Sequence, residues 1–154
     1  MQSDADNPAS QDNWVVVEPN LFDYPVPKGQ KPALYANRCQ ACQGVYFPKR
    51  DTCPKCFSNG KLVNQSISGR GTIYAATVVH IPSPSGIRPP YAYGYVDMNI
   101  GDGNSQLRLF AHFTEADPQR LSVGQAVELS IGEIRRDDQG RAVIAHVFQP
   151  VDQE

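Results

Sequence analysis

The feature that most constrains this chain of 154 residues is the placement of its four cysteines. They form two C-x-x-C pairs separated by ten residues, all within residues 37–56. Two residues between thiolates allow a tight turn to direct both sulfurs at one ion, and two such turns complete a tetrahedral site. The spacing therefore predicts one bound metal, zinc or iron in its place, with the ligands Cys39, Cys42, Cys53 and Cys56.

Disulfide bonds and redox chemistry are the other common uses of paired cysteines. The N-terminal segment is acidic and polar, where a secretory signal needs a basic and then an apolar stretch, so we expect a cytoplasmic protein. Structural disulfides are rare in that reducing compartment. A thioredoxin-like site would place a single C-x-x-C at the start of a helix in a βαβ pattern, which this sequence lacks. Because four thiolates leave no position open for water or substrate, we expect the metal to be structural.

The net charge of −2 hides an uneven distribution of charge along the chain. Residues 28–70 carry eight basic side chains and one acidic side chain, whereas the segments before and after are acidic on balance. Such a cluster is either a solvated face or a site for phosphates or for an acidic partner surface. As a candidate anion site we single out Lys49, Arg50 and Lys55.

From residue 69 onward, short runs of β-branched and aromatic residues alternate with turn signals. Five segments are predicted to be strands: 71–81, 91–100, 106–113, 126–134 and 141–151. Five strands without a long helical pattern predict a closed barrel, and an OB-like barrel is favoured because open edges of that length would promote aggregation. Residues 114–125 leave room for one helical turn, and Gly94 marks a bend or bulge in the second strand.

The segment before the cysteines is rich in proline, which rules out a long helix from Pro19 onward. We expect an extended arm there, with a short element around Trp14 to Val17. The sequence thus predicts a mainly β protein in three parts: an acidic, Pro-rich arm (1–32), a zinc ribbon (33–68) and a five-stranded barrel (69–154). No run of about 18 apolar residues is present, so we expect no membrane span.

A proline-rich loop, residues 82–90, joins the first two barrel strands. Prolines lower the entropy lost when a binding loop becomes ordered, and an exposed Ile87 beside Arg88 would be a suitable anchor for a partner. The partner-binding residues predicted here are Ile87, Arg88, Pro89 and Pro90.

Groups for catalysis are lacking in the sequence. There is no nucleophile elbow, no phosphate-binding glycine loop, and no cysteine beyond the four metal ligands. Each of the three histidines stands alone, so a structural or surface role is expected for each. A nucleic-acid module remains an alternative, because zinc ribbons and OB barrels both bind polynucleotides. The acidic barrel and the lack of basic residues among Tyr91, Tyr93 and Tyr95 weigh against it.

The ribbon spacing, "YFPKRDTCPKC", "SGRGTIYAATVVH", "YAYGYVDM" and "LSVGQAVEL" together resemble a known family over residues 33–150. This is the zinc-ribbon OB-fold family associated with acyl-CoA metabolism, once classed as a domain of unknown function. The resemblance implies a non-catalytic subunit of a thiolase-like enzyme, or in relatives of a hydratase or aldolase, that supports assembly and handling of a coenzyme A thioester. Members act in aromatic degradation, including the benzylsuccinate route for toluene, and in steroid degradation. The sequence does not choose among these routes.

Overall fold

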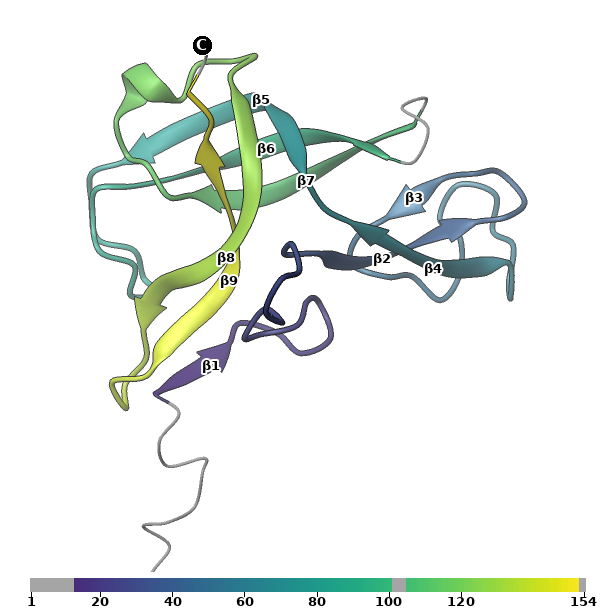
Figure 1. Ribbon diagram of the computed structural model, residues 1–154, viewed down its shortest axis with the longest axis horizontal. Helices are drawn as coiled ribbons and strands as arrows, with labels where there is room; N and C mark the ends of the chain where they lie inside the picture. The colour runs from purple at the N-terminus through teal and green to yellow at the C-terminus, as the bar shows by residue number, and fades with distance from the viewer. Residues whose placement is uncertain (1–12, 101–104, 153–154) are drawn as a thin grey trace, which may run out of the picture.

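The computed structural model of the protein describes residues 13–100 and 105–152, and most of them lie in β-strands or in the turns between strands (Figure 1). Within these ranges there is no α-helix, and one 3₁₀ turn, Pro118–Arg120, occupies the connection where a helical turn was expected. No helix in the same ranges is long and apolar enough to cross a membrane.

Five strands close into a barrel, which confirms the predicted OB-like fold. Their order is β9-β7-β6-β5-β8, and β8 pairs back with β9 to close the ring. All neighbours are antiparallel except β7 and β9, which run parallel. The bounds of these strands are β5 Arg70–Val79, β6 Tyr91–Ile100, β7 Ser105–Phe113, β8 Ala126–Arg136 and β9 Ala142–Pro150.

The cysteine-rich part forms a separate three-stranded antiparallel sheet beside the barrel, on the right in Figure 1. Its strand order is β3-β2-β4. The bounds are β2 Leu34–Cys39, β3 Val45–Tyr46 and β4 Leu62–Ile67. The short element expected near Trp14 is β1 (Trp14–Val16), which pairs in parallel with β9 on the outside of the barrel.

The structure has a β-bulge beside Gly94, but the bulge is on the neighbouring strand β5 and not on β6, which carries Gly94. The register between β5 and β6 shifts between Ile73 and Ala75, so Tyr74 is the extra residue. Gly94 is needed there because a Cβ at this position would collide with the carbonyl of Ala75. The Tyr74 side chain at this bulge is exposed.

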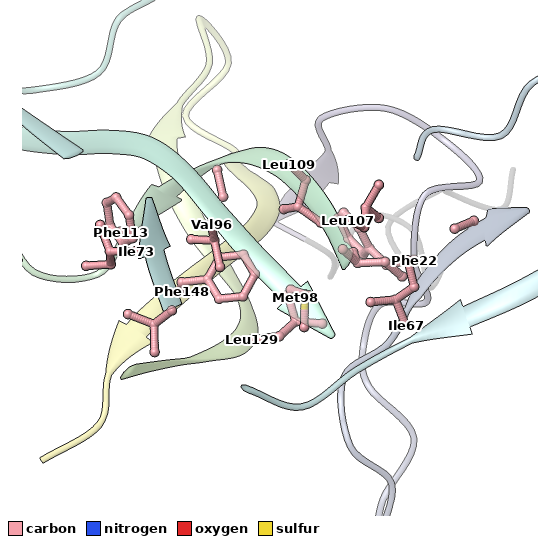
Figure 2. Close-up of a cluster of buried hydrophobic side chains, with 14 of the residues drawn as sticks. Phe22, Ile67, Ile73, Val96, Met98, Leu107, Leu109, Phe113, Leu129 and Phe148 are labelled. Carbon is pink, nitrogen blue, oxygen red and sulfur yellow. The ribbon is translucent and has the colours of Figure 1, made fainter. Parts of the chain in front are cut away.

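One hydrophobic core extends from the barrel to the ribbon and the arm. Val96 and Phe148 are fully buried inside the barrel, and the core continues from there toward Leu107 on β7. Figure 2 shows Phe22 from the arm and Ile67 from the end of β4 beside Leu107. The ribbon is therefore held against the barrel by shared apolar packing and not only by its connecting chain.

Candidate metal centre and surrounding surfaces

Two turns of the same backbone design carry the four cysteines. In each, the amide of the residue four positions after the first cysteine donates to that cysteine's carbonyl: Gln43 to Cys39 at 2.7 Å and Phe57 to Cys53 at 2.8 Å. Both donors have positive φ angles, 67° for Gln43 and 63° for Phe57. In each turn this left-handed residue directly follows the second cysteine of the pair, at the point where the turn ends.

The four Sγ atoms all lie within 4.8 Å of one another, as the spacing predicts. The Sγ atoms of Cys39 and Cys56 are 3.6 Å apart, and those of Cys42 and Cys53 are 3.5 Å apart. A tetrahedral zinc with Zn–S bonds of about 2.3 Å separates its sulfurs by about 3.8 Å. The residues therefore fit one tetrahedral ion, and four protein ligands make such a site closed and structural.

The sulfur of Cys53 lies among hydrogen-bond donors. Burial raises its pKa, but the Tyr46 hydroxyl at 3.3 Å and the backbone amides of Cys56 and Lys55 lower it, and the net pKa is about 5. The chain thus stabilises the thiolate form of Cys53, which is the form that binds a metal.

Of the three basic residues predicted to bind an anion, Lys49 has the most definite surroundings. Its ammonium donates to the side-chain oxygen of Asn64 at 2.8 Å and lies 5.7 Å from the centre of the Tyr35 ring. These three residues line a hollow of about 540 Å³ between the start of the ribbon and β4. Arg50 and Lys55 are exposed and do not line it, and the anion site stays a prediction.

The loop of residues 82–90 differs from the expectation at Ile87. Its side chain is half-buried rather than exposed, because it packs at the end of the barrel, where it lines a hollow of about 310 Å³ with Tyr91, His112 and Ile131. The exposed isoleucine of this region is Ile81, just before the loop. The other predicted contact residues are exposed: Arg88, Pro89 and Pro90.

A group of outward aromatic side chains on β6 and β7 was only partly visible in the sequence. Tyr91, Tyr93 and Tyr95 alternate with buried residues along β6, so they share one face of the strand, and this face is the outside of the barrel. Phe110 on β7 joins them, with its ring centroid 5.4 Å from that of Tyr93. The signal for Phe110 was its place between Leu109 and Ala111, both of which face the core.

His146 on β9 was treated as an isolated histidine, and the structure places it at the junction between ribbon and barrel. Its Nε2 lies 2.9 Å from the carbonyl oxygen of Phe110, and the Phe47 ring of the ribbon packs edge-on against it at 5.3 Å between centroids. Burial lowers the pKa of His146. No local feature of the sequence could have paired it with Phe47.

Comparison with known families matches both parts of the chain. A model described as the rubredoxin-like zinc ribbon domain of ChsH2 matches residues 28–61, and one described as the C-terminal OB-fold domain of ChsH2 matches residues 64–132. The zinc-ribbon match and the four gathered sulfurs together support a structural zinc.

Several named relatives are similar over most of their length. The benzoylsuccinyl-CoA thiolase subunit BbsA of Geobacter metallireducens is 30% identical over 127 residues, which is 82% of this chain and 81% of that protein. The protein of the same name from Thauera aromatica is 29% identical over 94% of both chains. A DUF35 domain-containing scaffold protein of Methanocaldococcus jannaschii is 29% identical over 77% of this chain and 82% of the relative.

Among solved structures, a chain of the Ltp2-ChsH2(DUF35) aldolase matches with a TM-score of 0.56 and 26% sequence identity. The match covers 76% of this chain and 84% of that chain. This chain therefore shares its fold with the matched chain over most of the length of both.

Proposed function

This chain belongs to the family in which a ChsH2-type zinc ribbon precedes an OB-fold domain, and on this basis we propose that it is a non-catalytic accessory subunit of a thiolase-like acyl-CoA enzyme. The observation that carries the proposal is the similarity, along most of both chains, to a protein named as a subunit of benzoylsuccinyl-CoA thiolase. The chemistry of the chain agrees with it. All four cysteines are used as metal ligands, so a nucleophilic cysteine would have to come from the partner.

Copurification and reconstitution test this function. The full chain is isolated with its native partner, the partner is identified by mass spectrometry, and the thiolytic cleavage of acyl-CoA is measured for each subunit and for the mixture. We expect activity in the mixture and none in this chain alone. Turnover by this chain alone, or full activity of the enzyme without it, would contradict the accessory role.

An aldolase partner is the second candidate, because the solved structure that matches is named an aldolase. The same copurification distinguishes the two. A thiolase-like partner that cleaves acyl-CoA with free coenzyme A supports the first proposal, and a partner that splits a β-hydroxyacyl-CoA into an aldehyde or ketone and a shorter acyl-CoA supports the second.

We also propose that the basic surface around Lys49 holds a phosphate of coenzyme A in the assembled complex. The support is the excess of basic residues in the ribbon and the hollow of about 540 Å³ that Lys49 lines with hydrogen-bonding neighbours. A charge-assisted contact from an ammonium to phosphate is stronger than a neutral hydrogen bond. Arg50 and Lys55 would add exposed positive charge at the edge of this site.

Charge reversal separates this role from simple docking. Lys49→Glu and Arg50→Glu are compared with Lys61→Glu, an exposed base of the same ribbon that does not line the hollow. A raised Michaelis constant for acyl-CoA with unchanged assembly supports phosphate binding. Weaker assembly alone supports docking to an acidic partner surface, and no change in either quantity refutes both.

A further inference from the structure

The outer face of β6 and β7 carries a run of aromatic side chains that the barrel core does not use. Tyr95 and Phe110 are 46% and 44% exposed, with ring centroids 5.9 Å apart. Tyr93 contacts Phe110 and stacks with Tyr91, whose centroid is 6.3 Å away. We call this surface the aromatic stripe. Its members are Tyr91, Tyr93, Tyr95, Phe110 and His112 on β6 and β7, together with Tyr74 at the bulge of β5.

The charges on the stripe cancel. The Arg108 guanidinium lies 3.4 Å from the centre of the Tyr74 ring and is paired with both carboxylate oxygens of Asp97, at 2.7 and 3.0 Å. Arg108 is the one lysine or arginine among the described residues of β6 and β7, and burial lowers the pKa of His112, which keeps that ring neutral at pH 7. The stripe is therefore apolar, with no net charge.

At its other end the stripe opens into the hollow of about 310 Å³ beneath the loop of residues 82–90. Tyr91 and His112 belong to both the stripe and the hollow, Ile87 and Ile131 provide apolar walls, and Glu133 adds a carboxylate to the lining. A flat aromatic surface beside a half-apolar hollow is the form of an interface in which one anchor side chain enters a pocket and neighbouring rings exclude water.

Two kinds of macromolecule could use this face. In OB folds the corresponding second and third strands commonly bind single-stranded nucleic acid, and aromatic rings there stack on bases. Such binding depends on unpaired lysine and arginine side chains that neutralise phosphates, and the described outer face of β6 and β7 has none. Tyrosine and arginine with few free charges are instead the composition of the centre of a protein–protein interface.

We propose that the aromatic stripe and the adjoining hollow form the surface on which the thiolase-like subunit docks. The absence of net charge on the stripe calls for a neutral, apolar patch on that subunit, and the hollow, lined by Ile87, Ile131 and Glu133, calls for one projecting side chain with an apolar stem. This inference rests on the proposed function and adds the surface and the chemistry of the partner's contact.

The experiment measures the dissociation constant between the full chain, loaded with zinc, and the purified thiolase-like subunit. We expect Tyr95→Asp and Phe110→Asp each to raise it about 30-fold or more, as for a central interface residue. Val17→Asp is the matched control, because Val17 is 45% exposed but lies next to β1, outside the stripe; it should change the constant less than about threefold. Unchanged zinc content and thermal midpoint show that each variant is folded.

A measurement on the unmodified protein does not depend on the folding of variants. Hydrogen exchange of the wild-type complex should show slower exchange at residues 91–96 and 107–112 when the thiolase-like subunit is bound. If the subunit binds but neither exchange nor affinity responds at the stripe, the docking surface is wrong while the proposed function stands. If the wild-type chain binds no thiolase-like subunit, the proposed function fails, and this inference fails with it.

Two further results would also overturn the assignment. Binding of a single-stranded oligo-dT of about 16 nucleotides that is lost in Tyr95→Asp would make the stripe a nucleic-acid site. A dimer of this chain alone that dissociates in the same variant would make the stripe a contact between two copies.

Discussion

At the scale of single residues, Tyr46 is the side chain that links the ribbon strands to the metal centre. Its hydroxyl lies 3.3 Å from the sulfur of Cys53 and donates to the thiolate. Gly44 makes room for this contact, because a Cβ there would collide with the Tyr46 ring. We predict that Tyr46→Phe lowers zinc affinity about tenfold, as loss of a hydrogen bond to a metal ligand commonly does. Competition with a chromophoric chelator measures it.

Tyr35→Phe is the control for that experiment, since Tyr35 lies in the same ribbon but donates to Asp23 and not to a sulfur. It should leave zinc affinity unchanged. Equal affinities for Tyr46→Phe and the wild type would show that the sulfur does not need this donor.

At the scale of elements, the contact between the ribbon and β9 depends on a neutral His146. Its Nε2 donates to the Phe110 carbonyl, which leaves Nδ1 as the unprotonated nitrogen, buried and without a hydrogen-bond partner among the described residues. A second proton would place a charged N–H at Nδ1 with no acceptor, beside the ring of Phe47. Burial therefore lowers the pKa of His146 in the folded protein.

This lowered pKa predicts how stability changes with pH. Below about pH 6.5, the ordinary pKa of histidine, the unfolded chain binds a proton at His146 that the folded chain does not, so stability falls as the pH decreases from 7 to 5. His112, also lowered by burial, contributes in the same direction. His146→Gln should reduce this loss of stability, measured by urea unfolding at pH 7 and pH 5.

Comparison of variants separates the histidine from acid release of the metal, which affects every variant alike. His80→Gln, at an exposed position, should keep the full pH dependence. If the free energy of unfolding of His146→Gln fell as much between pH 7 and pH 5 as that of the wild type, the His146 ring would not be the group that causes the pH dependence.

The elements themselves followed largely from local pattern, whereas the contacts between them did not. Alternation of apolar residues predicted β6 at its observed bounds, and the cysteine spacing predicted the gathering of four sulfurs. The parallel pairing of β1 with β9 and the packing of Phe47 on His146 join segments far apart in the chain. The burial of Ile87 likewise depends on how its loop folds back over β8. Such contacts leave no periodic signal, so they required the structure.

At the scale of the whole molecule, the arm, ribbon and barrel meet in one core. Phe22 from the arm and Leu34 and Ile67 from the ribbon belong to the same buried cluster as Met98 and Leu107 of the barrel. The ribbon sheet is small, and its cysteine turns are held by hydrogen bonds and by the metal. A change at the zinc site should therefore reach the barrel through these apolar contacts.

Removal of zinc by a strong chelator tests this coupling. A structural zinc site of this kind contributes about 10 kcal/mol or more to folding, so we expect residues 34–67 to lose protection from hydrogen exchange. Without the packing of Leu34 and Ile67, protection should also fall around Met98 and Leu107, which belong to the same buried cluster. Re-addition of zinc should restore both regions. A ribbon that stays protected when metal analysis finds less than about half an equivalent of zinc would show that the cysteine turns hold their fold without the ion.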